Sequence, residues 1–307
     1  MKYIKIMRLD HWIKQLFIIP GCIFSLIMTG INFEIEIIGR FILGFFATCF
    51  IASANYVINE YLDAEFDKYH PIKKQRPAVA AGLNGKVVVV LWIALTIVGC
   101  GTALFLGKAF ALSAVWLWVM GIVYNVKPIR SKDLPFIDVL SESVNNAIRL
   151  LMGWFIISAN TFPPCSIILG YWMGGAFLMG TKRYAEYRMI NNPAIAANYR
   201  KSFAYYTETS LLISSFNYAM LSVFFTGVFL IKYRIELVLF IPALIGLFGY
   251  YFWLSFKADS AVQKPEKLFR EKGLMLFCAV CVILFVFLMI TDIPWLSMFV
   301  DNTLLTF

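Results

Sequence analysis

The chain has 307 residues, of which 61% are hydrophobic and 17% aromatic, while only 15% are charged. A soluble domain carries about 25% charged residues, so this composition excludes a soluble globular protein and predicts an integral membrane protein. The net charge of +9 does not indicate nucleic-acid binding, because the basic residues are divided among short loops between apolar segments.

Nine apolar runs approach or exceed the ~20 residues that a helix needs to cross the bilayer. They are residues 15–31, 37–58, 86–106, 109–124, 136–158, 165–182, 206–231, 235–256 and 273–292. The first run follows a basic N-terminus but lacks an A-x-A-like cleavage site, so we expect it to be retained rather than removed as a signal peptide. We therefore predict an all-α integral membrane protein with nine transmembrane helices in one bundle, forming a single domain over residues 1–307.

The loop charges predict the orientation of this bundle. With nine spans, the N-terminus and the loops after the second, fourth, sixth and eighth spans share one side, and they hold most of the Lys and Arg residues. The opposite side holds only Arg40, Lys108, Lys232 and Arg234. By the positive-inside rule the N-terminus is cytoplasmic and the C-terminus lies outside. We expect a multi-pass protein of a bacterial plasma (inner) membrane.

Cysteine and histidine usage indicates neither a disulfide framework nor a metal cluster. All six cysteines lie in or beside apolar runs, which favours plain packing. Cys278 and Cys281 form a CxxC pair, but "LFCAVCVILF" contains no His or acidic residue to complete a metal or redox site. The two histidines, His11 and His70, are too few and too far apart in the sequence to indicate a cluster.

Acidic and amide side chains gather at the end of the second span, in "NEYLDAEFDKYH". Asn55, Asn59, Asp63 and Asp67 recur every four residues, which places them in one stripe on a helix. Two carboxylates one turn apart can bind Mg²⁺, whose remaining positions go to water and substrate phosphate. Asn59 can add a carbonyl oxygen. We therefore predict a Mg²⁺ site at Asn59, Asp63 and Asp67; the alternative is a solvated helix end.

Basic side chains lie close to these acids in the sequence, on the same side of the membrane. The segment "HPIKKQRPAVAAG" provides His70, Lys73, Lys74 and Arg76; the loop "YNVKPIRSKDLP" provides Tyr124, Lys127, Arg130 and Lys132; and "TKRYAEYR" provides Lys182 and Arg183. Basic groups beside metal-binding acids suit a diphosphate, because metal ions bridge some phosphate oxygens while Lys and Arg hold the others. The alternative for some of these residues is a topological anchor.

The fifth span also carries polar residues within an apolar run. Asp138, Glu142, Asn145 and Arg149 step by four, three and four residues, which places them along one helix face. Ionisable groups inside a span usually face the bundle interior and mark function; a structural Glu142–Arg149 pair is the alternative. Together the polar segments predict a cavity that opens to the cytoplasm, with a Mg²⁺-bound diphosphate at its mouth and a lipid tail along its apolar walls.

The residues resemble those of a known family. The pattern Asn59-Glu60-x-x-Asp63-x-x-x-Asp67 resembles the NDxxDxxxD motif of the UbiA superfamily of intramembrane prenyltransferases. The loop "YNVKPIRSKDLP" resembles the Y-x-x-x-P-x-R-x-K loop of that superfamily. The resemblance covers most of the chain and implies a UbiA-like fold and a Mg²⁺-dependent transferase with a lipid substrate. The chain departs from the pattern at Glu60, where Asp is usual, and after the sixth span, where Glu186 stands in place of a DxxxD pair.

Two stretches resemble one branch of the superfamily, the polyprenyl-phosphate phosphoribosyltransferases. They are "MRLDHWIKQLFIIP" and "DKYHPIKKQRP". This branch moves 5-phosphoribose from phosphoribosyl diphosphate to a lipid phosphate, and the missing DxxxD pair favours it. The resemblance implies that Asn59, Asp63 and Asp67 hold Mg²⁺ and diphosphate. It also implies phosphate contacts from Lys14, His70, Lys73, Arg76, Lys127, Arg130 and Lys132.

Two other functions stay open. The first is transfer of a prenyl group from a prenyl diphosphate to an aromatic or other small acceptor, which needs the same diphosphate site. The second is a transporter or lipid-binding membrane protein without catalysis, because polar helix faces inside the membrane also occur in transporters. All three predict a lipid or bilayer partner and no nucleic acid, and none assigns an oligomeric state.

Overall fold

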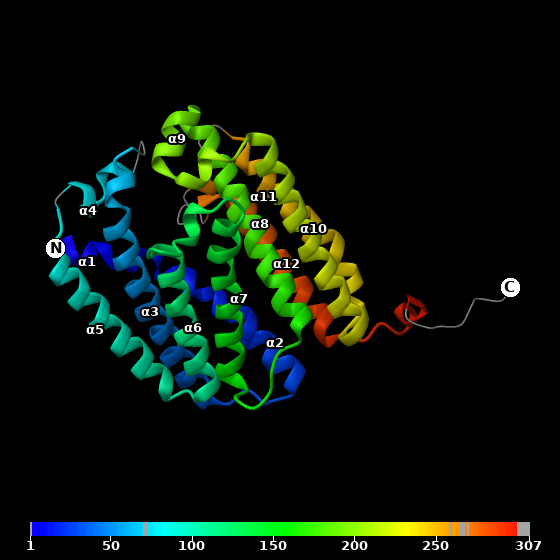
Figure 1. Ribbon diagram of the computed structural model, residues 1–307. Coiled ribbons are helices and arrows are strands. Elements are labelled where there is room, and N and C mark those ends of the chain that lie inside the picture. Colours follow the sequence, from blue (N-terminus) through cyan, green and yellow to red (C-terminus); the bar gives the residue numbers. More distant parts are fainter. Residues whose placement is uncertain are drawn as a thin grey trace.

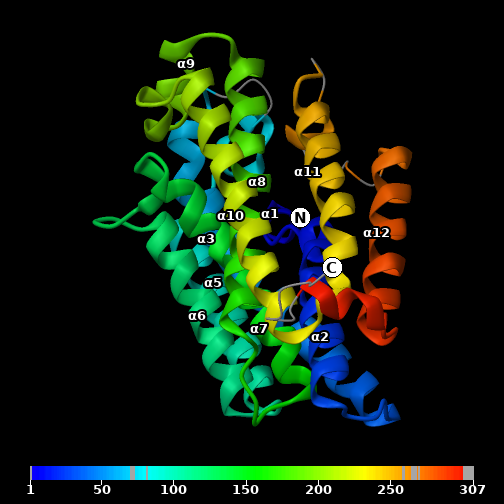
Figure 2. The same ribbon diagram turned by 90° about the vertical axis from the view of Figure 1, so that its right-hand side faces the viewer.

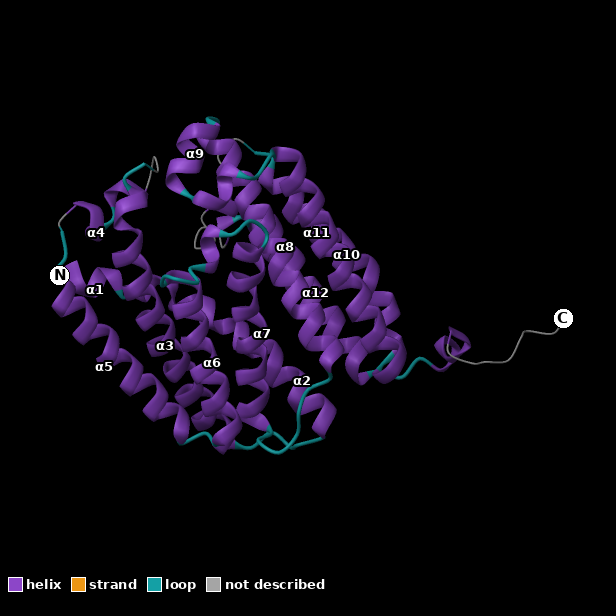
Figure 3. Ribbon diagram, in the orientation of Figure 1, coloured by secondary structure: helices purple, strands orange, loops and turns teal. Residues whose placement is uncertain are grey.

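A backbone in lipid must satisfy its own hydrogen bonds, and helices do this within one segment. The computed structural model describes residues 2–69, 73–80, 82–257, 260–263, 268 and 270–299, and every regular element within them is an α-helix or a 3-10 helix (Figure 3). The predicted all-α class is therefore confirmed.

Twelve α-helices follow one another along the described residues. They are α1 (Lys2–Ile6), α2 (Ile19–Thr29), α3 (Ile35–Asp67), α4 (Pro77–Ala80), α5 (Gly85–Leu104), α6 (Lys108–Asn125), α7 (Ile137–Ile157), α8 (Cys165–Ile190), α9 (Pro193–Tyr199), α10 (Glu208–Tyr233), α11 (Ile241–Ser255) and α12 (Lys272–Ile290). Short 3-10 helices connect them: η1 (Leu9–Ile18), η2 (Lys73–Gln75), η3 (Ser131–Asp133), η4 (Lys201–Ala204), η5 (Ile235–Phe240), η6 (Ala261–Gln263) and η8 (Pro294–Phe299).

Seven helical segments in the described part of the chain are long and apolar enough to cross a membrane, so the protein is a multi-pass integral membrane protein. These segments contain α2, α3, α5, α6, α10, α11 and α12. Helices α7 and α8 have the necessary length but are more polar: α7 carries Asp138, Glu142 and Arg149, and α8 ends in a basic segment. The number of nine spans therefore stays a prediction.

The long helices run between two ends of the bundle. In Figure 1 the connections from α2 to α3, from α5 to α6 and from α7 to α8 lie at one end, while α4 and α9 lie at the other. Helix α11 lies beside α8 and α10, and α12 packs against α11 and η5, away from α5 and α6 (Figure 2). Phe24 of α2 makes an edge contact with Phe285 of α12, at 5.2 Å between ring centroids, so the first and last long helices also meet.

Helices α2 and α7 approach each other closely because glycines face both backbones. A Cβ atom at Gly21 would overlap the carbonyl oxygen of Leu150, and one at Gly153 would overlap that of Ile18. The Cys22 thiol donates to the Gly153 carbonyl at 3.2 Å. Without side chains between them, the two backbones pack directly, as small residues commonly permit in membrane bundles. This contact brings η1 and α2 against the polar face of α7.

A short helical segment, α9 and η4, covers the end of the bundle at which α3 ends. Asn192 caps α9 by accepting hydrogen bonds from the backbone N–H groups of Ala194 and Ile195, at 3.0 and 3.1 Å. Aromatic side chains then pack the segment onto α8; they are Tyr184, Tyr199, Phe203 and Tyr206. The segment is thereby held beside the ends of α3 and α7.

Candidate active site

Helix α3 continues past its apolar part and presents the acidic stripe on its last turns. The Asp63 carboxylate accepts hydrogen bonds from Arg130, at 3.0 Å, and from Lys132. It also accepts from the side-chain amide of Asn59, at 3.1 Å. Arg130 stands 67 positions away in the sequence. The fold thus brings the loop between α6 and α7 against the stripe that the sequence predicts as the Mg²⁺ site.

Asn125, at the end of α6, connects these groups. Its side-chain oxygen accepts from Asn59 at 2.6 Å and from Lys132 at 2.8 Å, and its backbone oxygen accepts from Arg130 at 3.1 Å. Arg130 adopts a left-handed backbone conformation, with φ of 34°. Such conformations cost of order 1–3 kcal/mol outside glycine and occur often at functional sites. Sequence analysis missed Asn125; its only signal was its place beside Tyr124 in the loop motif.

The second carboxylate of the stripe has its own cation. Asp67 is buried and accepts from Arg76 at 2.5 Å. Burial lowers the pKa of Arg76, but the Asp67 carboxylate outweighs this and raises it. Burial also lowers the pKa of Lys132, to about 8, against the raising effect of Asp63. Both predicted metal-binding carboxylates are therefore engaged by cationic side chains from loops.

A second polar cluster lies where α6, α7 and α8 meet. The Tyr124 hydroxyl donates to Glu142 at 2.7 Å and accepts from Arg183 at 3.1 Å. Arg183 also binds Glu142 and donates to Asp138 at 3.3 Å. Its side chain is only 1% exposed. These residues, all predicted from the sequence, thus form one ion-pair cluster inside the bundle.

Asp138 connects this cluster with α9 and η4, the segment that covers this end of the bundle. It accepts hydrogen bonds from the hydroxyls of Tyr206, at 2.6 Å, and Ser202, at 3.1 Å. Arg200, at the C-terminus of α9, donates to the Tyr124 hydroxyl at 3.2 Å and lies 3.6 Å from Asp138. Sequence analysis counted Arg200 only among the basic loop residues. Because Asp138 already has these partners, its geometry is that of an anchor for α9 and η4.

Of the other two residues predicted on α7, Arg149 contacts the N-terminal part of the chain and Asn145 contacts its own helix. Arg149 donates to Gln15 at 2.7 Å and to Asn146 at 3.3 Å, so Glu142 pairs with Arg183 rather than with Arg149. Asn145 donates to the backbone oxygen of Glu142 at 3.1 Å.

The other residues predicted to contact phosphate stand on neighbouring segments, and some of them lie outside the described structure. Lys14 lies 3.1 Å from His11, while Lys74 and Lys127 are exposed. Lys182 is half-buried beside Arg183. His70 and the side chain of Lys73 lie outside the described residues. Glu60, the departure from the family motif, is buried and pairs with Arg8 at 3.1 Å.

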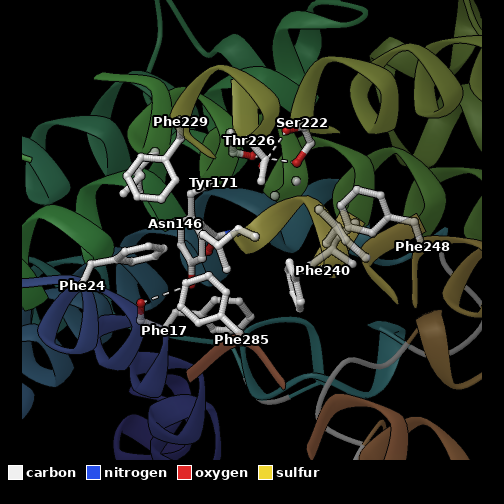
Figure 4. A pocket seen from close by; sticks show the side chains of 17 residues that line it. Phe17, Phe24, Asn146, Tyr171, Ser222, Thr226, Phe229, Phe240, Phe248 and Phe285 are labelled. Atoms are coloured by element: carbon white, nitrogen blue, oxygen red, sulfur yellow. Dashed lines mark hydrogen bonds between the residues drawn. The ribbon is translucent and has the colours of Figure 1, made fainter. Parts of the chain in front are cut away.

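An apolar cavity of about 240 Å³ lies between α2, α8, α10, α11 and α12. Figure 4 shows the phenyl rings around it, which are Phe17, Phe24, Phe229, Phe240, Phe248 and Phe285. On the α8 side it is bounded by Gly170, Gly174 and Gly175. A Cβ at Gly170 or Gly174 would lie 3.2 Å from the hydroxyl of Thr226 or Ser222, so these two glycines let α10 pack closely against α8.

One polar residue connects this cavity with the inner face of α7. Asn146 lines the cavity and accepts from Arg149. It fits beside α8 because residue 175 is glycine: an added Cβ would lie 2.7 Å from the Asn146 amide nitrogen. The cavity suits a hydrocarbon chain, since burial of apolar surface is its main available interaction.

Helical spans, an acid–cation site at one end and an apolar cavity within the bundle define a membrane protein that binds a charged group together with an apolar one. The profile of the UbiA prenyltransferase family matches residues 17–280. The chain therefore belongs to the UbiA prenyltransferase family.

Individual relatives agree with this assignment. The chain is 28% identical to decaprenyl-phosphate phosphoribosyltransferase of Mycolicibacterium smegmatis over 212 residues, which are 68% of this chain but only 63% of that protein. It is 27% identical to protoheme IX farnesyltransferase of Shouchella clausii, over 71% of this chain and 72% of that one. A UbiA homologue from Archaeoglobus fulgidus, solved with DMAPP and Mg²⁺, has a TM-score of 0.69 at 18% identity, covering 92% of this chain and 99% of that one. At that identity the likeness shows the fold.

Proposed function

We propose that the protein is a Mg²⁺-dependent transferase that moves 5-phosphoribose from phosphoribosyl diphosphate to a polyprenyl phosphate. One observation carries the proposal: Asp63 and Asp67, one helical turn apart, are both held by cationic side chains that are themselves able to bind phosphate. The first supporting relative is named for a lipid-phosphate phosphoribosyl transfer. We also propose that this end of the bundle faces the cytoplasm, because its loops are rich in Lys and Arg.

The donor groups fit Mg²⁺ bound together with a diphosphate, and not Mg²⁺ alone. No three His, Cys, Asp or Glu side chains are grouped to hold a metal ion anywhere in the described residues. Mg²⁺ commonly uses one or two protein carboxylates and takes its other ligands from water and substrate phosphates. Asp63 and Asp67 would supply the carboxylates. Asn59 bonds through its amide nitrogen, so its carbonyl oxygen would be the third protein ligand.

The reaction breaks the bond between the anomeric carbon and the diphosphate oxygen, and the electron pair leaves with diphosphate. An oxygen of the lipid phosphate then forms the new bond to that carbon. Bound Mg²⁺ neutralises negative charge that develops on the leaving group. Arg130, Lys132 and Arg76 would hold the remaining diphosphate oxygens in fixed positions, which stabilises the same charge. The burial of Arg130 and Lys132 excludes water and strengthens their contacts.

The apolar cavity supports a lipid as the second substrate. Burying one CH₂ group contributes about 0.8 kcal/mol, so even a short section of a polyprenyl chain in this cavity adds useful affinity. Transfer of a prenyl group from a prenyl diphosphate is the second candidate, since the Shouchella clausii relative is named as a farnesyltransferase. Both reactions need the diphosphate site and the cavity.

One experiment separates these functions. Detergent-purified protein with Mg²⁺ is incubated with ribose-labelled phosphoribosyl diphosphate plus decaprenyl phosphate, and in parallel with labelled farnesyl diphosphate plus aromatic acceptors. We expect labelled lipid in the first reaction only. Labelled product only in the second would establish prenyl transfer instead, and no product in either would favour a non-catalytic lipid-binding protein.

A further inference from the structure

Arg200 has a buried donor that no group in the described structure accepts. Its Nε atom is buried and lacks a hydrogen-bond partner, and its side chain is 13% exposed. A buried N–H group of a charged side chain is costly to leave unpaired, and such groups call for a specific explanation. A ligand that accepts this hydrogen bond would provide one.

The surrounding chain holds Arg200 in place. It ends α9, where its backbone N–H donates to the Ala196 carbonyl at 2.9 Å. The rings of Tyr199 and Phe203 lie about 6 Å from its guanidinium carbon, at 6.0 and 5.9 Å. These contacts fix the guanidinium before any ligand arrives, so a ligand would find the donor already oriented.

Arg200 lies between the two polar clusters. Its Nη1 atom donates to the Tyr124 hydroxyl, which belongs to the Arg183 cluster. The Lys132 ammonium lies 5.7 Å from the centre of the Tyr124 ring and binds Asp63. Arg200 and the Lys132–Asp63 pair therefore both lie beside Tyr124.

The neighbouring carboxylates do not occupy this donor. Asp138 lies 3.6 Å from the Nη1 atom of Arg200, not from Nε, and also pairs with Arg183. Glu142 binds Arg183, and Glu186 lies 3.6 Å from the Arg183 guanidinium. Guanidinium groups bind phosphate oxygens well, because their planar N–H donors match the oxygens of an oxyanion.

We propose that Arg200 binds a phosphate-monoester oxygen of a substrate through its Nε atom, next to the diphosphate site rather than within it. The inference rests on the proposed function, in which two such groups occur: the 5-phosphate of the donor and the phosphate of the lipid acceptor. Either one gives Arg200 a role in distinguishing phosphorylated substrates from prenyl transfer substrates, which lack a monoester.

The test measures binding of three probes to the purified full-length protein in the presence of Mg²⁺: ribose 5-phosphate, farnesyl phosphate and inorganic pyrophosphate. We expect Arg200→Gln to weaken binding of one monoester probe by about tenfold, the worth of one hydrogen bond to a charged group. Loss for ribose 5-phosphate assigns the donor, and loss for farnesyl phosphate assigns the acceptor. Pyrophosphate affinity should change little.

Arg188→Gln is the matched control, because Arg188 stands on α8 with its side chain 40% exposed and, among the described residues, contacts Tyr184, Phe256 and Glu208. It should leave all three affinities unchanged. If Arg200→Gln does not yield folded protein, Arg200→Lys decides the question, since lysine keeps the charge but lacks Nε and should weaken the same probe. Unchanged monoester affinities in the folded variant, or an equal loss for pyrophosphate, would overturn the proposal.

The outcome is separable from that of the proposed function. Arg200-dependent binding of a monoester without any ribosyl transfer would refute the reaction but keep the site. Ribosyl transfer with affinities independent of Arg200 would keep the reaction and refute the site.

Discussion

The protein contains two acid–cation clusters that differ in how their cations are held. In the first, Arg130 and Arg76 reach the acids of α3 from loops, and the Arg76 side chain is 21% exposed. In the second, Arg183 stands on a helix, is 1% exposed and is shared among three carboxylates. A cation on a loop can move from a carboxylate to an incoming phosphate. Arg183 stands on a helix and already contacts three carboxylates, so its position is fixed. The first cluster is therefore suited to exchange of partners and the second to support.

The largest effect is expected from a substitution that breaks the second cluster, at Arg183. Arg183→Gln removes the nearest cation of the buried Asp138 and of Glu142, and leaves Asp138 with Arg200 at 3.6 Å. Breaking a buried ion pair in this way costs about 3–5 kcal/mol. We expect a clear fall in the melting temperature of the detergent-solubilised protein. Arg188→Gln, which changes the same charge at a more exposed position, should melt like the wild type; an equal melting temperature for both variants would show that Arg183 has no supporting role.

The next largest effect is on the rate of transfer and comes from a substitution in the first cluster, at Asp63. Asp63→Asn keeps the size of the side chain but removes the charge that Arg130 and Lys132 bind. Loss of one group that fixes transition-state charge commonly costs about 10²–10³ in rate. We expect transfer to fall by this factor while the protein elutes as a folded species in gel filtration.

The control for this prediction is Glu65→Gln, an exposed carboxylate two residues further along α3, which should keep full activity. Wild-type turnover in Asp63→Asn would remove Asp63 from the proposed metal site.

A smaller effect tests whether the first cluster exchanges partners. Asp63 and Asp67 carry two negative charges and face three cations, Arg130, Lys132 and Arg76. A divalent ion alone adds like charge to this cluster, whereas a diphosphate gives the cations new partners. We expect Mn²⁺, a paramagnetic substitute for Mg²⁺, to bind about tenfold more tightly with pyrophosphate, a coupling of about 1.4 kcal/mol. Electron paramagnetic resonance titration measures it, and equal affinity with and without pyrophosphate would contradict partner exchange.

The two clusters also differ in what the sequence could predict. The stripe of Asn59, Asp63 and Asp67 follows from four-residue spacing, which is a local property of one helix. The helices themselves follow from the lengths of the apolar runs, and the structure confirms the all-α class. The cationic partners of the acidic residues cannot be predicted from local spacing. Arg183 and Asp138 are 45 positions apart, so their pairing depends on how α7 and α8 pack.

Arg200 and Asn125 show the same limit more sharply. Nothing in the local sequence distinguishes Arg200 from the other basic loop residues, since its place depends on the cap of α9 and on the anchor at Asp138. Asn125 acts through both its side chain and its backbone, from the end of α6. Charge and spacing identify which residues are candidates, while the packing of distant helices decides which of them meet.

The smallest effect expected on transfer concerns Glu60, where the chain departs from the family motif. Glu60→Asp introduces the usual residue but shortens the side chain by one methylene, so the 3.1 Å contact with Arg8 is lost. A hydrogen bond to a charged group contributes about 1.5–3 kcal/mol, and one Glu60 oxygen already lacks a partner. We therefore expect a modest fall in melting temperature, while transfer stays within about threefold of wild type because no proposed substrate contact is lost.

The matched control is Arg8→Gln, which removes the same contact from the other side. If Glu60 serves only to hold the N-terminal segment on α3, both variants should lower the melting temperature and leave the Mn²⁺ affinity measured with pyrophosphate unchanged. A selective loss of Mn²⁺ affinity in Glu60→Asp, at unchanged melting temperature, would instead place Glu60 with Asp63 and Asp67 in the exchanging cluster. The Glu60 carboxylate would then contribute to metal binding rather than only contact Arg8.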